Sequence, residues 1–523
     1  MADIINLVLT PSEAFNQDMV ETAVREKLGP KVSAEQHIRI LKRSIDARQK
    51  AVKVNLQVQV SDQPLPPRIT YKRDYPNVSE APEAIIVGAG PAGMFAALRL
   101  IELGVKPILL ERGKDVRARR RDLAAINKEH IVNPDSNYCF GEGGAGTYSD
   151  GKLYTRSKKR GDVRRVLEIL VAHGAREEIL IDAHPHIGTN KLPRIVAELR
   201  ESILQAGGEV RFDARVTELI IESHNVTGVV LADGEKIRGN GVILATGHSA
   251  RDIFDMLIRQ NVEIKAKPFA LGVRVEHHQS LIDKIQYRTP DRGPWLPASS
   301  YALVQQVSYD RAERGVFSFC MCPGGFIVPA ATAPGEIVVN GMSPSRRDSR
   351  YANSGIVVAV NPEDIPDYHQ YGELAALRFQ QDIEQKACLL AGNTQTAPAQ
   401  RLVDFTNKKI SADLPETSYQ PGLMSTDMNN VLPPAIAERL IGGFKAFGRK
   451  MKGYFTNEAQ VVGVESRTSS PVQVPRDRIS LEHSTISRLY PCGEGAGYAG
   501  GIVSAAMDGE RCAEKLFERY GKA

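Results

Sequence analysis

The stretch AIIVGAGPAGMFAALRLIELGVKPILLER, residues 84–112, decides the fold of this chain. It opens with a short apolar run, passes through a glycine-rich turn into a long apolar helical segment, and ends in a second apolar run that stops at Glu111. Strand, turn, helix and strand in this order predict a βαβ unit that binds a dinucleotide. We therefore expect an α/β protein built around a Rossmann-like domain.

The glycine spacing within the turn supports this prediction. Gly88, Gly90 and Gly93 form the pattern G-x-G-x-x-G, which permits a tight turn, admits a pyrophosphate and allows close helix–strand packing. Glu111 is placed to accept hydrogen bonds from ribose hydroxyls, and Arg112 is placed to lie over the adenine. The contacts expected from this segment are Gly88, Gly90, Pro91, Ala92, Gly93, Glu111 and Arg112.

Later segments indicate FAD rather than NAD as the dinucleotide. An apolar strand ends in Thr246-Gly247, and the meander of strands before it, which contains Val216, resembles the interior of glutathione-reductase-type flavoproteins. The segment LYPCGE, which ends on Gly493-Glu494, resembles the strand–Gly–Asp motif of that group, whose acid binds the ribityl chain. Here glutamate replaces the aspartate. The resemblance implies a glutathione-reductase-type domain that binds FAD without a covalent link.

The start of the last helix is a further candidate contact. Gly500 and Gly501 leave backbone N–H groups bare just before Ile502. A helix N-terminus carries about half a positive charge, which would stabilise negative charge at one edge of the flavin. An ordinary tight turn is the alternative interpretation.

The most individual motif is FGEGGAGTYSDGKL, residues 140–153. Five glycines within 12 residues imply that the backbone approaches another group very closely. We expect that group to be the flavin or its pyrophosphate. The contacts expected from this motif are Gly143, Gly144, Ala145 and Thr147.

With this motif the chain resembles a family of bacterial FAD-dependent proteins described as NAD/FAD-utilising dehydrogenases of unassigned substrate. The resemblance also rests on KRSIDAR at residues 42–48, CPGG at 322–325 and ESRTSSP at 465–471, and it runs along nearly the whole chain. It implies the fold and FAD, and it leaves the substrate open.

Changes in composition along the chain suggest its domain organisation. Residues 1–62 are typical of a small α/β module, and the prolines of residues 63–82 favour an extended linker. We expect the FAD-binding domain at residues 83–265 and 481–523. Residues 266–480 would then form a mixed α/β substrate domain, inserted before the closing segment.

Composition excludes several classes of protein. The chain has 523 residues, 42% hydrophobic and 25% charged, which is ordinary for a globular protein. A net charge of +5 requires neither nucleic acid nor a membrane as partner, and no apolar run approaches the ~20 residues that span a bilayer. The six cysteines are scattered, as in a reducing compartment. We expect a cytoplasmic protein without a membrane partner.

The sequence leaves the catalytic residues open. Cys320 is expected to be a small buried residue, whereas Cys322, before Pro-Gly-Gly, is expected to line a cavity and is the better candidate for a thiol near the flavin. His248 can touch a substrate, although a surface or core position is favoured. Tyr148 and Tyr498 either cover the flavin or simply pack. No metal site is expected, because His184-Pro185-His186 has no cysteine nearby.

Nucleic acid is an improbable partner by charge. Two basic clusters, at residues 117–121 and 158–165, are expected to be solvated helical faces, with an anionic substrate or RNA as the alternative. Residues 1–80 contain 12 lysines and arginines against 10 aspartates and glutamates, a difference of +2. That difference is far below the charge of a nucleic-acid-binding domain.

We therefore expect an FAD-dependent oxidoreductase that transfers hydride between the flavin and an unidentified small molecule. A flavin-dependent RNA-modifying protein and a non-enzymatic FAD-binding scaffold are the alternatives. Residues 250–480 contain no second strand–G-x-G-x-x-G–helix pattern, so NAD(P)H is expected to enter the substrate cavity directly, as a substrate. Arg346 and Arg347 are candidates to hold its phosphates, with a surface role as the alternative.

Overall fold

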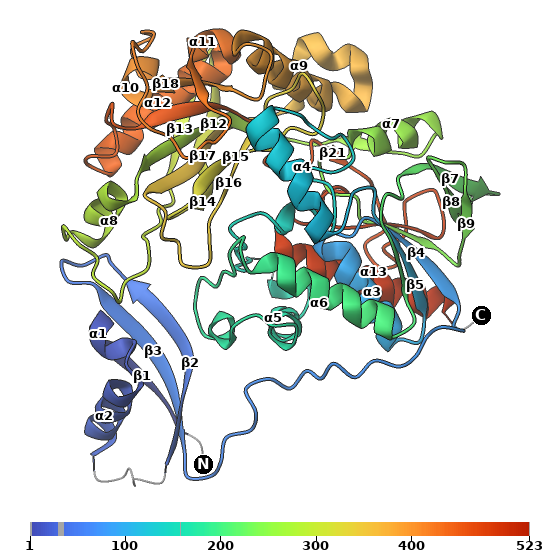
Figure 1. Cartoon of the computed structure of the whole chain (residues 1–523), viewed down its shortest axis with the longest axis horizontal. Coiled ribbons are helices and arrows are strands. Elements are labelled where there is room, and N and C mark those ends of the chain that lie inside the picture. The colour runs from blue at the N-terminus through green and yellow to red at the C-terminus, as the bar shows by residue number, and fades with distance from the viewer. Residues whose placement is uncertain (1–2, 30–35, 157, 522–523) are drawn as a thin grey trace.

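The N-terminal module is a three-stranded antiparallel sheet with two helices on one face (Figure 1). The structure, a computed structural model, describes residues 3–29, 36–156 and 158–521. Strands β1 (Asp3–Leu9), β2 (His37–Asp46) and β3 (Lys53–Ser61) lie in the order β1-β3-β2, beside helices α1 (Pro11–Ala14) and α2 (Gln17–Leu28). Every second residue of β3 from Val54 to Val60 is buried, because alternate side chains of a strand point to one face.

Residues 63–82 run as extended chain from the module to the main body (Figure 1). They are fixed to helix α5 (Val163–Ala172), where the Glu168 carboxylate accepts hydrogen bonds from the Thr70 N–H and hydroxyl, both at 2.9 Å, and from the Tyr71 N–H at 3.0 Å. Tyr71 and Tyr75 also pack against the apolar core of the body. The segment is therefore part of the body's surface as well as a connection.

The body is built on a five-stranded parallel sheet, in the order β22-β10-β4-β5-β6. Its strands are β4 (Glu83–Val87), β5 (Lys106–Leu110), β6 (Glu209–Arg211), β10 (Val242–Leu244) and β22 (Leu489–Pro491). Apart from Glu83 and Lys106, which begin β4 and β5, the central strands are apolar, as expected when both faces of a sheet are covered. Since β22 pairs with β10, the C-terminal segment returns to the sheet, as the resemblance implied.

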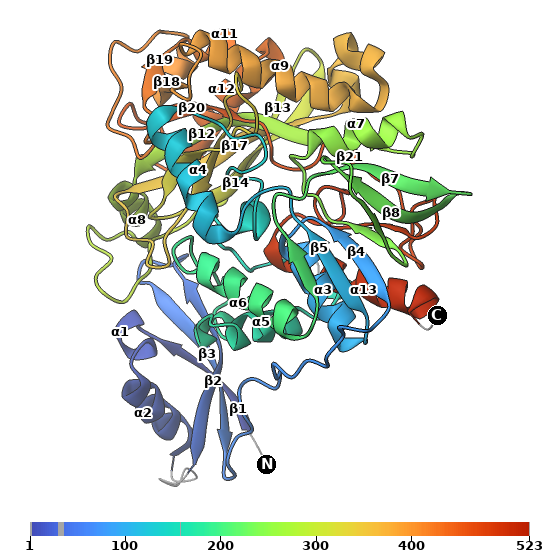
Figure 2. The ribbon, with the colours of Figure 1, turned by 45° about the vertical axis from the view of Figure 1, so that its right-hand side comes forward.

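Helices cover one face of this sheet and a small antiparallel sheet covers the other (Figure 2). The elements are α3 (Pro91–Glu102), α6 (Leu192–Gln205) and α13 (Ile502–Tyr520) on one side, and β7 (Val216–Glu222), β8 (Asn225–Leu231) and β9 (Lys236–Arg238) on the other. Helices α3 and α13 cross so closely that a Cβ atom at Gly509 would lie 2.0 Å from the Ala92 carbonyl oxygen.

Between β10 and β22 the chain forms a second domain around a seven-stranded sheet, in the order β13-β14-β17-β12-β20-β18-β19. These strands are β12 (Phe269–His278), β13 (Val304–Tyr309), β14 (Ala312–Cys322), β17 (Tyr351–Val360), β18 (Ala397–Arg401), β19 (Leu423–Ser425) and β20 (Gln460–Glu465). Helices α9 (Ala375–Leu390) and α12 (Pro434–Lys450) pack on this sheet and share its apolar core. All neighbouring strands are antiparallel except β18 and β19.

This architecture is the α/β fold that the sequence predicted, a Rossmann-like sheet with a mixed α/β domain inserted before its last strand. Helices α3 and α13 both follow strands of one parallel sheet, so both begin at the edge formed by the carboxyl ends of the strands. Among the described residues, no helix combines the length and apolar character that crossing a bilayer requires.

Candidate functional site

A cavity of about 400 Å³ lies at the carboxyl ends of β4 and β10, between the parallel sheet and the second domain. Four glycine-rich segments that the sequence singled out meet at this cavity: the turn after β4, the loop at residues 144–146, the turn after β10 and the start of α13. Ligands of open α/β sheets bind at this edge, so the location suits a nucleotide.

Some of these glycines lie where two segments pack too closely to leave room for a side chain. A Cβ atom at Gly88 would lie 2.5 Å from the Ala245 carbonyl oxygen, and one at Gly93 would lie 1.9 Å from the Gly88 carbonyl oxygen. A Cβ atom at Gly144 would lie 3.3 Å from the Gly90 Cα atom. Only glycine permits the first two contacts, which fix the turn after β4 against the turn after β10 and against α3.

Other glycines leave open space on the cavity side. A Cβ atom at Gly90, Gly247, Gly500 or Gly501 would meet no atom within 4 Å, and all four residues line the cavity. Gly90 and Gly501 are also the N-cap residues of α3 and α13, and neither helix has a side-chain cap. Two uncapped helix N-termini beside one cavity favour negatively charged groups such as a pyrophosphate.

Glu111 organises this end of the cavity. Its carboxylate accepts three backbone hydrogen bonds at 2.9 Å, from the N–H groups of Ala89, Gly113 and Gly141. It thereby joins the turn after β4 to the glycine-rich loop, a role that the sequence did not reveal. Arg112 lies over the Phe140 ring, 4.3 Å from its centroid, and also lines the cavity.

Most of the predicted contacts line the cavity, namely Gly88, Gly90, Pro91, Ala92, Glu111, Arg112, Gly144, Ala145, Val216, Thr246, Gly247, Glu494, Gly500, Gly501 and Ile502. Gly93, Gly143, Thr147 and Gly493 correct the prediction, because they lie behind the wall. The Thr147 hydroxyl donates to the Glu142 carbonyl oxygen at 2.9 Å, and the Gly493 N–H donates to Asp508 at 2.8 Å. These four residues support the backbone that faces the cavity.

Known protein families match this chain along most of its length. Residues 82–240 match a family described as FAD binding domain, residues 268–468 match FAD-dependent protein, C-terminal domain-like, and residues 1–61 match a domain of unknown function. A protein of Clostridium beijerinckii, described as uncharacterized, is 40% identical over 99% of this chain and 98% of its own length. This chain belongs to the same family of FAD-dependent proteins. Its cofactor is FAD.

Other known proteins are similar to this chain at lower identity. The thiamine thiazole synthase of Aeropyrum pernix is 27% identical over 183 residues, which cover 32% of this chain and 55% of that protein. Among solved structures, a triple mutant of the flavin-dependent brominase Bmp2 is similar at 12% identity and a TM-score of 0.36, over 84% of this chain and 81% of that one.

The cavity suits FAD along its length. The open side of Gly90 and the N-terminus of α3 offer space and positive charge that suit a pyrophosphate, and Glu111 and Val216 line the same cavity. Glu494, which the sequence predicts to bind the ribityl chain, lines the cavity, and burial raises the pKa of its carboxyl to about 7. Near neutral pH this side chain can therefore donate or accept a hydrogen bond.

A cluster of charged residues from both domains borders the cavity, where Asp150 and Lys152 form part of the wall. The Asp150 carboxylate, 1% exposed, lies 2.5 Å from Arg347 and 3.4 Å from the Lys152 ammonium. Burial acts to raise the pKa of Asp150, but the two cations outweigh it and hold that pKa well below its ordinary value. Two cations against one carboxylate leave a charge of +1. Arg347 is thus paired and not free to hold a coenzyme phosphate, which corrects the prediction.

The surroundings of the two cysteines of β14 are the reverse of those expected. Cys320 lines the cavity, whereas Cys322 is fully buried behind it and its thiol donates to the Cys320 carbonyl oxygen at 3.3 Å. The reason is a break in the strand: Cys320 has φ 45°, and the pairing of β14 with β17 shifts between Phe319 and Cys322. The regular alternation of side chains along β14 therefore ends before Cys320, so the two cysteines have different surroundings.

His248 lies at the cavity wall, in a short hydrogen-bonded chain. Its Nδ1 atom is 2.9 Å from the Ser249 hydroxyl, which donates to the Cys139 sulfur at 3.5 Å. Burial lowers the pKa of His248 to about 4, so the ring is neutral at physiological pH. Tyr148 and Tyr498 do not line the cavity; their hydroxyls donate to backbone carbonyls, which supports the packing interpretation for both.

The basic cluster at residues 117–121 is not simply a solvated face. Arg119 is fully buried and donates to the carbonyl oxygens of Asn137, Glu142 and Gly144 at 2.8 to 3.0 Å. It pins the glycine-rich loop that borders the cavity. A sequence pattern cannot show this, because the partners are backbone atoms more than fifteen residues away.

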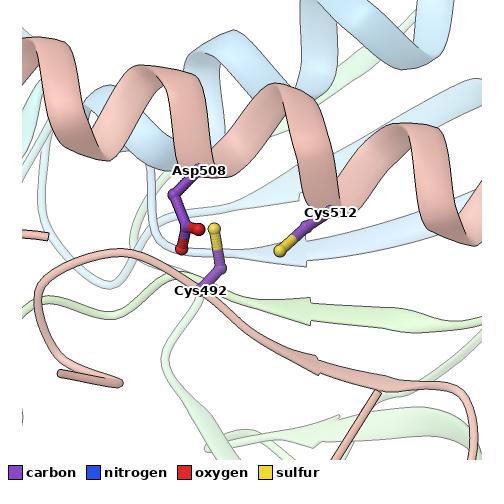
Figure 3. A group of neighbouring side chains, drawn as sticks. All are labelled: Cys492, Asp508 and Cys512. Carbon is purple, nitrogen blue, oxygen red and sulfur yellow. The ribbon is translucent and has the colours of Figure 1, made fainter. Parts of the chain in front are cut away.

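Three side chains of metal-binding type meet inside the FAD-binding domain, between α13 and the end of β22, although their contacts argue against a metal site. Cys492, Asp508 and Cys512 lie with ligand atoms within 4.8 Å of one another (Figure 3). Arg476 contacts both Asp508 oxygens, at 2.6 and 3.0 Å, and donates to the Cys512 sulfur at 3.4 Å. The guanidinium therefore already supplies the positive charge that a cation would bring.

Proposed function

We propose that this flavoprotein is an oxidoreductase that moves hydride between FAD and a small molecule bound at the second-domain end of the cavity. One observation carries the proposal: the cavity continues past the flavin-binding glycines into a wall of polar residues from both domains. These residues are Asp150, Lys152, Tyr154, Cys320, Asn340, Arg467 and Thr468. A scaffold that only bound FAD would not need such a wall.

Several residues of the chain have defined parts in this proposal. FAD, when bound, supplies the two-electron chemistry. The N-terminus of α13 stabilises negative charge at the flavin edge, and Lys152 presents an ammonium group to the substrate region. Arg467 is 6% exposed and ion-paired to Glu336 and Glu384 at 3.0 and 2.8 Å, so it gives this wall a fixed shape.

The electron source that we propose is reduced nicotinamide, bound as a direct substrate. The chain has one complete βαβ dinucleotide motif with its following acid, at residues 88–111, and we assign that motif to FAD. A coenzyme must then approach through the cavity instead of docking on a second Rossmann domain. We infer that reduction saturates only at high coenzyme concentration.

The test begins with the cofactor and continues with its reduction. Acid precipitation of the purified protein should release the flavin, and chromatography should identify it as FAD. The FAD-loaded protein is then mixed anaerobically with NADH or NADPH while the flavin absorbance is followed. Flavin bleaching whose rate saturates only at high coenzyme concentration supports the proposal. Flavin absorbance that no reductant changes would contradict it and favour a scaffold, and fast reduction with tight saturation would contradict entry through the cavity.

A further inference from the structure

A second hollow, of about 300 Å³, lies beside the flavin cavity at the junction of the two domains. It is lined by Arg176, Asn190, Lys191, Pro344, Ser345, Arg346 and Asp348. We call it the basic hollow. Three segments form its wall: Arg176 lies after α5, Asn190 and Lys191 directly precede α6, and the remaining residues come from the loop after Ser343 in the second domain.

The charge of the basic hollow is not balanced. Three cations, Arg176, Lys191 and Arg346, face one carboxylate, Asp348, which leaves +2. None of the three forms an ion pair with any residue in the described part of the chain, although their neighbour Arg347 is tightly paired to Asp150. Cations that converge without a partner repel one another, so the arrangement favours a bound anion.

The two loops that form the hollow are locked together. The Ser345 N–H donates to Asn190 Oδ1 at 2.8 Å, and the Thr189 N–H donates to the Ser343 carbonyl oxygen at 2.9 Å. A Cβ atom at Gly188, which has φ 91°, would lie 2.2 Å from the Ser345 nitrogen. The hollow therefore has a fixed backbone frame, and only the ends of its basic side chains are free to move.

This frame also forms part of the flavin cavity. The Leu153 N–H donates to the Pro185 carbonyl oxygen at 2.9 Å and the Ile187 N–H donates to Gly151 at 3.1 Å, so segments 150–154 and 184–188 lie antiparallel. Lys152 and the half-exposed Tyr154 of the first segment line the cavity, and the second segment leads directly to Asn190 and Lys191 of the hollow. An elongated molecule can thus lie with one end in each.

We propose that the basic hollow binds the 2′-phosphate end of NADPH while the nicotinamide enters the flavin cavity past Tyr154. This inference rests on the proposed function, because it assigns the electron donor of that reaction. Guanidinium groups suit phosphate because they donate paired, charge-assisted hydrogen bonds. NADH lacks the 2′-phosphate and would leave the three cations unpaired. The protein should therefore prefer NADPH.

Direct binding provides a test that does not depend on turnover. The FAD-loaded protein is titrated calorimetrically with adenosine 2′,5′-bisphosphate, and with AMP as the ligand that lacks the 2′-phosphate. We expect the bisphosphate to bind at least tenfold more tightly than AMP, and R346Q or K191Q to weaken it tenfold or more. The matched control is R350Q, because Arg350 is also exposed but pairs with Glu416 at 2.9 Å outside the hollow.

Flavin reduction provides the second readout. In the unchanged protein, half-saturation should need at least tenfold less NADPH than NADH, and R346Q should remove that difference without changing the response to NADH. Equal binding of the bisphosphate by R346Q, R350Q and the unchanged protein would overturn the inference. Bisphosphate binding that depends on Arg346 but brings no preference for NADPH would overturn the assignment of the ligand. Failure of both coenzymes to reduce the flavin would contradict the proposed electron source instead.

Discussion

At the residue scale, two glycines of one turn have opposite surroundings. A Cβ atom at Gly90 would meet nothing within 4 Å, whereas one at Gly93 would lie 1.9 Å from the Gly88 carbonyl oxygen. Gly90 also has φ −75° and ψ −176°, a conformation open to any residue. We infer that Gly90 leaves space for the ligand, whereas Gly93 is required by the packing of the protein itself.

This contrast predicts different results for two valine substitutions. Gly90→Val should leave the protein folded and abolish FAD binding, because the side chain occupies space that the pyrophosphate needs. Gly93→Val should instead lower the yield of folded protein, since it separates α3 from β4. Circular dichroism and the flavin content of the purified variants measure both effects. A full flavin content in Gly90→Val would show that this turn does not hold the pyrophosphate.

Reactivity should distinguish the two cysteines of β14. The neighbouring Cys322 side chain lowers the pKa of Cys320 well below its ordinary value despite burial, and the Lys152 and Arg274 cations add to this effect. The Cys320 side chain and burial raise the pKa of Cys322. Because thiolates are the reactive form, iodoacetamide at pH 7 should label Cys320 in the FAD-free protein and leave Cys322 unlabelled.

Peptide mass spectrometry after timed labelling measures this difference. Lys152→Met should slow the labelling of Cys320, since it removes one of the two cations, and bound FAD should protect Cys320 because both share the cavity. Preferential labelling of Cys322 would contradict the arrangement described for β14.

At the element scale, the linker is held by the body more than by the module. Glu168 holds Thr70 and Tyr71, and the Tyr71 hydroxyl donates to Glu102 at 3.0 Å. The module itself contacts the body through fewer groups, among them the ion pair of Arg43 with Asp182 at 2.8 Å. The part that can be removed without exposing the body's core therefore ends before Thr70.

Two truncations test this boundary. A chain that begins at residue 68 should remain soluble and bind FAD, because it keeps the packing of Tyr71 and Tyr75 on the core. A chain that begins at Val78 loses both tyrosines and should have a Tm several degrees lower. Thermal unfolding of the two FAD-loaded proteins makes the comparison. Equal Tm values would mean that the linker adds no stability.

At the scale of the whole molecule, buried histidines should make stability depend on pH. Burial lowers the pKa of His173, in the FAD domain, and of His277, in the second domain, to about 4. The folded protein keeps both rings neutral below pH 6.5, whereas the unfolded chain protonates them. Stability is therefore full above pH 6.5 and falls as the pH decreases toward 4, by up to about 3 kcal/mol for each fully buried ring.

The Tm should accordingly fall between pH 7 and pH 5, and His277→Gln should reduce that fall. Glutamine can still donate to the Tyr454 carbonyl oxygen, which His277 contacts at 2.8 Å, but it takes up no proton. His37→Gln, at an exposed position of the module, is the control and should leave the pH dependence unchanged. An identical pH profile in all three proteins would exclude His277 as a contributor.

The sequence by itself determined the Rossmann-like sheet, FAD as cofactor and most of the segments that border the cavity. These features depend on local rules. A G-x-G-x-x-G turn between a strand and a helix has one common use, and its glycines mark positions where either the protein or a ligand needs the space of a side chain. The return of residues 489–491 to the sheet was also predictable, through the resemblance that the segment LYPCGE carries.

Only the tertiary structure decided which side chains face the flavin. Cys320 lines the cavity in place of Cys322, because Cys320 itself has φ 45° and interrupts the alternation of side chains along β14. Arg119 became a buried support and Arg347 a paired cation, since their partners come from distant segments. The basic hollow joins residues 176, 190–191 and 344–348, which have no common pattern. Spacing in a sequence fixes the direction of a side chain within one regular element, whereas its partners depend on how the elements pack.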